Sequence, residues 1–113
     1  MKSPEIKDWD CIEYDPIGKW IPDDPAEVDF WLNMTIGIKG ETGGDNFLVH
    51  IVTEKLISQL ENRSHILVVP YYFGMNDIIE RVNVILESCH DLNWSGMAEQ
   101  ISKIYYWEFE SMR

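Results

Sequence analysis

Three histidines and two cysteines are the residues of this 113-residue chain best suited to metal binding or nucleophilic catalysis. His50, His65 and His90 are spread out, and none pairs with a cysteine at the spacing of a zinc site. Cys89 adjoins His90, a poor geometry for joint ligation, and lies on an apolar stripe, where cysteine is usually inert. Ser64 precedes His65 without a Gly-x-Ser-x-Gly motif. We therefore predict no catalytic residue, no metal site and no cofactor, and a protein that is not an enzyme.

A cluster of glycines is the other feature that could bind a ligand. It comprises Gly37, Gly40, Gly43 and Gly44. A phosphate-binding loop joins a strand to a helix, whose amides then point at the anion. Here the glycines separate two strand patterns, and Glu41 and Asp45 would repel phosphate. We interpret the cluster as a hairpin turn that needs positive backbone angles.

The elements that must position these residues follow from the apolar spacing. Strand patterns occupy residues 5–11, 30–38, 47–52 and 66–69, and the third is apolar on both sides, which favours the sheet interior. Helical patterns run from Thr53, as a cap, to about Asn62, from Gly74 or Asn76 to Cys89, and from a cap at Asn93 to Tyr105. We predict one α+β domain over residues 1–113. Its antiparallel or mixed sheet has about four strands, with two to three helices packed on one face.

Net charge is the strongest global signal. Twenty acids against nine lysines and arginines leave a charge of −11. This field repels nucleic acid and anionic membranes, so neither is an expected partner, whereas it attracts basic proteins. Solubility alone is the alternative explanation.

The acids are concentrated in one segment. Between residues 8 and 29 there are eight acids and one base, Lys19, a net charge of −7. The acids are Asp8, Asp10, Glu13, Asp15, Asp23, Asp24, Glu27 and Asp29. Trp20 and Trp31 are candidate anchors beside them, because tryptophan is enriched where proteins bind one another. The alternative is a solvated surface with no partner.

The two cysteines, Cys11 and Cys89, belong to no spaced motif. No signal peptide or membrane-spanning stretch is visible. We therefore expect reduced thiols in a cytoplasmic protein, with a Cys11–Cys89 bridge left open. The oligomeric state is not predicted.

Two stretches carry a resemblance to a known family. They are IGIKGETGGDNF at residues 36–47 and WEFE at residues 107–110. Together with the order of strands and helices between them, they resemble the immunity protein 8 family of bacterial polymorphic toxin systems. The resemblance spans nearly the whole chain. It implies a cytoplasmic antitoxin that binds the C-terminal domain of a toxin.

The resemblance implies no catalytic residue, and its motif positions are expected to be structural. Gly37, Gly40, Gly43, Gly44 and Phe47 would shape the hairpin, and Trp107, Glu108 and Phe109 would form the closing segment, with the two rings pinned on the core.

The leading hypothesis is thus inhibition of a basic, nuclease-type toxin by occlusion of its active site. An acidic adaptor or regulatory module that binds another basic protein is the alternative, and a small enzyme of unknown type is a third reading.

Overall fold

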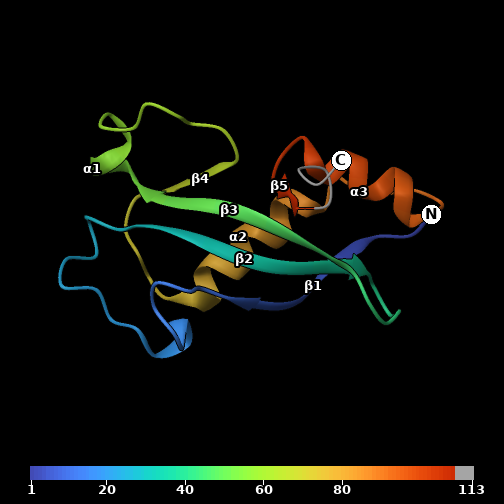
Figure 1. Ribbon diagram of the computed structural model, residues 1–113, viewed down its shortest axis with the longest axis horizontal. Helices are drawn as coiled ribbons and strands as arrows, with labels where there is room; N and C mark the ends of the chain where they lie inside the picture. The colour runs from blue at the N-terminus through green and yellow to red at the C-terminus, as the bar shows by residue number, and fades with distance from the viewer. Residues whose placement is uncertain (109–113) are drawn as a thin grey trace.

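The computed structural model describes residues 1–108, in which five strands form one sheet (Figure 1). The strands are β1 (Pro4–Asp10), β2 (Asp29–Ile38), β3 (Asp45–Thr53), β4 (Ile66–Val69) and β5 (Tyr106–Trp107). The helices are the 3₁₀ turn η1 (Ile17–Lys19) and the α-helices α1 (Glu54–Ile57), α2 (Met75–Leu86) and α3 (Trp94–Ser102). The α+β class predicted from the sequence is confirmed.

The sheet is mixed, with β3 in its interior. β1, β2 and β3 are antiparallel neighbours in chain order. On its other side β3 pairs with β4 in parallel through residues 50–53 and with β5 in antiparallel fashion through residues 47–48. The apolar character of β3 on both sides matches its burial: Phe47, Val49 and Ile51 are fully buried toward the core, and on the other face Val52 and His50, which stacks on Trp31, are at most 8% exposed. The predicted interior placement of this strand is confirmed.

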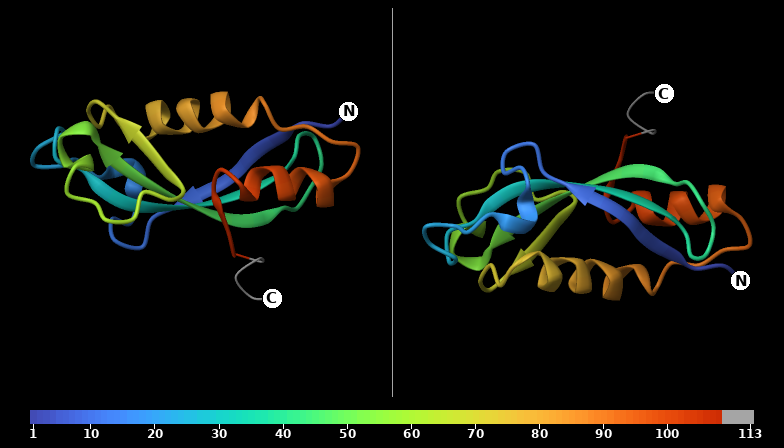
Figure 2. Two further views of the ribbon diagram at one scale, coloured as in Figure 1. Left: turned by 90° about the horizontal axis from the view of Figure 1, so that it is seen from above. Right: turned by 90° about the horizontal axis from the view of Figure 1, so that it is seen from below.

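Alternation along β2 assigns one sheet face to the core. Phe30, Leu32, Met34 and Ile36 are at most 1% exposed, whereas Trp31, Asn33 and Thr35 alternate with them toward the other face. The inward side chains pack with the apolar sides of α2 and α3. Figure 2 shows both helices on the same side of the sheet, as expected, and neither helix covers the opposite side.

Two predicted caps differ in outcome. Asn93 caps α3, since its side chain accepts a hydrogen bond of 2.9 Å from the amide of Gly96. Thr53 makes no such bond to α1. Its hydroxyl donates to the carbonyl of Ala26 at 2.7 Å and accepts from the amide of Val28 at 3.1 Å, so it fastens the acidic loop to the sheet.

The helix predicted to reach Asn62 is wrong in length, because α1 ends at Ile57. None of its residues is buried, so no packing stabilises further turns. α2 and α3 end at Leu86 and Ser102, a turn or less before the predicted limits. Strand β5 was not predicted as a strand.

Within residues 1–108, no helix combines the length and the apolar character that crossing a membrane requires.

Candidate functional site

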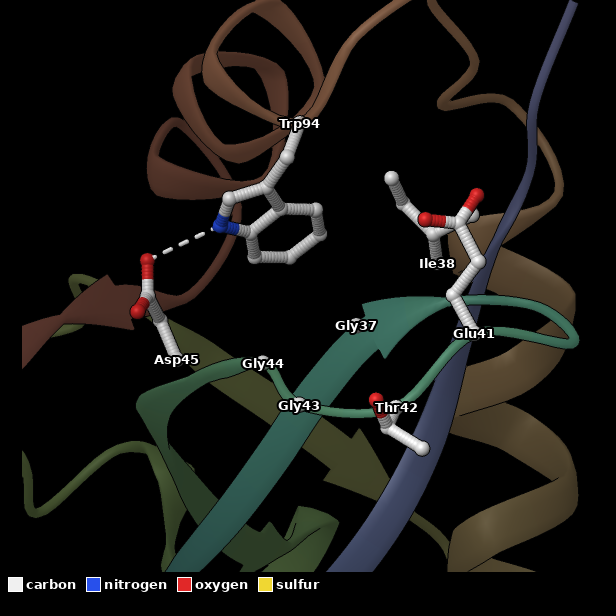
Figure 3. A pocket seen from close by; sticks show the side chains of 8 residues that line it. All are labelled: Gly37, Ile38, Glu41, Thr42, Gly43, Gly44, Asp45 and Trp94. Atoms are coloured by element: carbon white, nitrogen blue, oxygen red, sulfur yellow. Dashed lines mark hydrogen bonds between the residues drawn. The ribbon is translucent and has the colours of Figure 1, made fainter.

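The two sequence stretches that carry the family resemblance meet at the carboxylate of Asp45. This residue begins β3 immediately after the glycine-rich turn. Its Oδ2 accepts a hydrogen bond of 3.0 Å from the indole Nε1 of Trp94 and another of 3.2 Å from that of Trp107. One carboxylate thus joins the hairpin, the first residue of α3 and strand β5. The bond from Trp94 is drawn in Figure 3.

Phe47 packs beneath both indoles. Its ring lies nearly parallel to that of Trp107, with centroids 6.1 Å apart, and meets the ring of Trp94 edge-on at 6.4 Å. Trp107 is 8% exposed, so the closing segment is held against the core there. Glu108 follows in a half-buried position, and the predicted role of Phe109 falls outside the described residues.

The glycines are accounted for by the hairpin itself. Gly40 and Gly43 adopt φ of 82° and 86°, the left-handed region that favours glycine. At Gly37 an added Cβ would lie 2.1 Å from the carbonyl oxygen of Gly43, and at Gly44 it would lie 2.4 Å from that of Ile36. The turn therefore needs glycine for its backbone angles and for close contact between its two arms.

A hollow of about 250 Å³ lies between the hairpin and α3. Trp94 and Glu41 face each other across it, and glycines 37, 43 and 44 form one wall (Figure 3). Glu41 forms an ion pair of 2.9 Å with Lys2, and Asp45 holds the indole N–H of Trp94. The hollow is acidic and both of its carboxylates are engaged, which disfavours a phosphate ligand.

All eight carboxylates of the acidic segment are exposed, and they fall into two groups. The first group comprises Asp8, Asp10 and Asp29 in β1 and β2, together with Trp31, and the loop residue Glu13, whose Oε1 accepts a hydrogen bond of 3.5 Å from the amide of Trp31. The second lies in the loop between β1 and β2 and comprises Asp15, Asp23, Asp24 and Glu27, together with Trp20. Sequence proximity alone does not separate these groups.

Cross-strand register defines the uncovered face, because residues that pair across strands point to the same side. Beyond the pair Glu5–Gly37 at the hairpin end, four rows cross it: Asp8–Thr35–Asn46, Asp10–Asn33–Leu48–Tyr106, Trp31–His50–Ile66 and Asp29–Val52–Val68. None of these positions is lysine or arginine. Asn33 donates to Asp10 at 3.0 Å, and Thr35 donates to Asn46 at 3.1 Å. The uncovered face is thus a hydrogen-bonded, acidic surface with an aromatic row.

Trp31 is the largest side chain in these rows, and it is 39% exposed. Its indole stacks on the ring of His50, with centroids 4.6 Å apart and planes 10° from parallel. The carboxylate of Asp29 is hydrogen-bonded to Nε2 of His50. His50 was not among the residues selected from the sequence, because its position opposite Trp31 follows only from the register.

The loop group is arranged differently around Trp20. That ring stacks on Tyr14, with centroids 4.0 Å apart, and also contacts Phe30 and Tyr72 at the margin of the core. A hollow of about 280 Å³ beside it is lined partly by Asp23, Asp24 and Glu27. Glu27 forms an ion pair of 2.8 Å with Lys55. Trp20 is therefore half-buried and engaged within the molecule, unlike Trp31.

The groups considered for catalysis are dispersed or buried. Cys11 and Cys89 are both free and buried, and burial raises the pKa of the Cys11 thiol above its ordinary value, which disfavours the reactive thiolate. Residues 1–108 contain no group of three or more His, Cys, Asp and Glu side chains that could hold a metal ion. The described part of the chain thus offers charged and aromatic contact surfaces.

Comparison with known proteins identifies a family. Residues 4–112 match the model of a protein family described as Immunity protein 8. No curated protein and no solved structure matches the chain.

Proposed function

The chain belongs to the Immunity protein 8 family, and we propose that it neutralises a toxin by covering the active site of the toxin domain. Family membership makes the chain an immunity protein directed against a toxin. The kind of toxin and the mode of inhibition are our proposal. We place the encounter in the cytoplasm, where both free thiols would stay reduced.

The observation that carries the proposal is the exposure of all eight acids between residues 8 and 29. A nuclease domain needs a basic surface to hold phosphates, so an acidic partner complements it. Complementary charge can raise the association rate toward about 10⁸ M⁻¹s⁻¹, about a hundredfold above that of a neutral pair. A standard interface of about 800 Å² per partner is large enough to cover an active site.

Inhibition in this proposal requires no bond to be made or broken by the immunity protein. Its acids serve as a substitute for the phosphate groups that the toxin would otherwise bind. Aromatic side chains within the interface then slow dissociation, because buried Trp and Tyr carry much of the binding energy between proteins.

Co-expression with the toxin domain encoded beside this chain is the direct test. We expect the chain to restore growth and to co-purify with the toxin domain. Association rates should fall steeply when ionic strength rises from about 0.1 M to about 1 M, which shortens the Debye length from about 10 Å to about 3 Å. Rates that do not change with salt would remove electrostatic steering from the proposal. Failure to protect, combined with binding to a different basic protein, would favour an adaptor instead.

A further inference from the structure

We propose that the toxin docks on the uncovered face of the sheet, where an arginine-bearing segment of the toxin packs on Trp31. This inference rests on the proposed function and adds the location of the interface and the chemistry of its occupant. It selects the sheet group of acids over the loop group as the contact surface.

Trp31 has the properties of a preformed anchor. Its indole is 39% exposed, yet its orientation is fixed by the parallel stack on His50. His50 is in turn held by the carboxylate of Asp29 on the same face. An aromatic ring that is already ordered loses little conformational entropy when a partner covers it.

The surroundings of Trp31 favour a guanidinium group. Asp8, Asp10 and Asp29 share this face, no lysine or arginine stands in the four rows, and Lys7 at the bulge of β1 is ion-paired with Glu5. A planar guanidinium can stack on an indole while its N–H groups donate to carboxylates at the ring's edge.

Charge complementarity also argues against a second copy of this chain as the occupant. A symmetric contact would place the acids of one face against the same acids of the other. Like charges at close range are unfavourable unless they are neutralised. A basic protein, by contrast, supplies the missing positive charge.

Trp31→Ala is the primary variant. We expect it to weaken the affinity for the purified toxin domain about 30-fold or more, as truncation of a tryptophan hot spot does, mainly through faster dissociation. Phe73→Ala is the aromatic control, because Phe73 is 62% exposed in the connection between β4 and α2, outside the four rows. This control should keep the wild-type dissociation constant.

A charge-matched pair of double variants separates docking from steering. Asp8→Asn with Asp10→Asn alters the uncovered face, and Glu80→Gln with Glu87→Gln removes the same charge from exposed positions at α2. The first pair should slow association more than the second, because charges farther from the interface than a Debye length, about 10 Å at 0.1 M salt, are largely screened. Only the first pair should also speed dissociation, and it keeps the inference testable if Trp31→Ala fails to fold.

Three outcomes would overturn the inference. Wild-type dissociation rates in both the Trp31→Ala and Asp8/Asp10 variants would move the interface elsewhere while leaving the proposed function intact. A wild-type chain that neither binds nor neutralises the toxin domain would refute the proposed function itself. A dimer of the chain alone that Trp31→Ala dissociates, measured by sedimentation, would make the uncovered face a self-association surface.

Discussion

Replacing Asp45 by alanine should destabilise the fold strongly. Its carboxylate accepts hydrogen bonds from the indole N–H groups of Trp94 and Trp107, which join α3 and β5 to the hairpin. Hydrogen bonds to a charged group contribute about 1.5–3 kcal/mol each. The two bonds, at 3.0 and 3.2 Å, are only partly buried, so the lower end of that range applies. We expect a loss of about 3 kcal/mol in the free energy of unfolding. At about 4 °C per kcal/mol for a chain of this size, the melting temperature should fall by about 12 °C.

Urea unfolding followed by far-ultraviolet circular dichroism measures this loss without depending on indole fluorescence. Asp23→Ala is the control, because it removes an exposed aspartate from the loop outside the hairpin. Asp45→Asn should be intermediate, since the amide keeps one acceptor oxygen and loses the charge.

Double-mutant cycles attribute the loss to the two bonds. Trp94→Phe and Trp107→Phe each remove an indole N–H and leave an aromatic ring near Phe47. Each cycle with Asp45→Ala should give a coupling free energy of about 1 kcal/mol or more. Coupling below about 0.3 kcal/mol in both cycles, or equal stability of Asp45→Ala and Asp23→Ala, would refute this account of the hairpin.

Three further predictions concern packing and buried hydroxyl groups. Gly44→Ala should lower the free energy of unfolding by about 2–3 kcal/mol, since its Cβ would lie 2.4 Å from a backbone oxygen. Gly18→Ala is the control, because its Cβ would meet its nearest neighbour at 3.7 Å. It should change stability by less than about 0.5 kcal/mol in urea titrations. Tyr105→Phe should raise stability by about 1 kcal/mol, because the Tyr105 hydroxyl is buried without a hydrogen-bond partner among residues 1–108; a loss of stability would reveal a partner for it. Burial also raises the pKa of Tyr105 above its ordinary value of 10.0. The stability that this shift contributes is therefore complete below pH 10 and is lost as the pH rises further, because the unfolded chain then ionises first. Equal alkaline destabilisation of wild type and Tyr105→Phe, measured as urea midpoints, would contradict this.

The fold was predictable where packing imposes a regular period on the sequence. Residues 30–38 alternate because β2 has one face on the core and one face away from it, and the period of two records that difference directly. The strand at residues 66–69 was predicted with its observed bounds, since an apolar branched run stops at Pro70. Strand β5 is two residues long, too short to show any period. The longer helix predicted at α1 was wrong for a different reason. The apolar spacing there suggested a helix to Asn62, but none of the residues of α1 is buried in the core.

The candidate surface was only partly visible in the sequence. Composition identified the acidic segment, but it could not divide that segment into two groups, because the division depends on which strands pair. Asp10 and Asn33 are joined by the register of β1 on β2, and Trp31 meets His50 through the register of β2 on β3. Trp20 and Trp31 were equivalent candidates by residue type. Trp31 was already on the polar side of a strand pattern, which is the signal that could have ranked it above Trp20.

The geometry of β2 separates stability from recognition within a single strand. Leu32 and Met34 are fully buried, while Trp31 and Asn33 between them face away from the core. A substitution at an outward position leaves the inward contacts in place, because successive side chains point to opposite faces. The hairpin around Asp45 and the core beneath the sheet can therefore hold the strands in register while the outward residues are altered for a different partner.

On this reasoning, Trp31→Ala should impair toxin binding far more than it lowers the melting temperature, and Leu32→Ala should do the reverse, with a cost of about 2–5 kcal/mol in unfolding free energy. If both substitutions impaired binding and stability in the same proportion, the two faces of β2 would not be independent. The uncovered face would then not be a separate recognition surface.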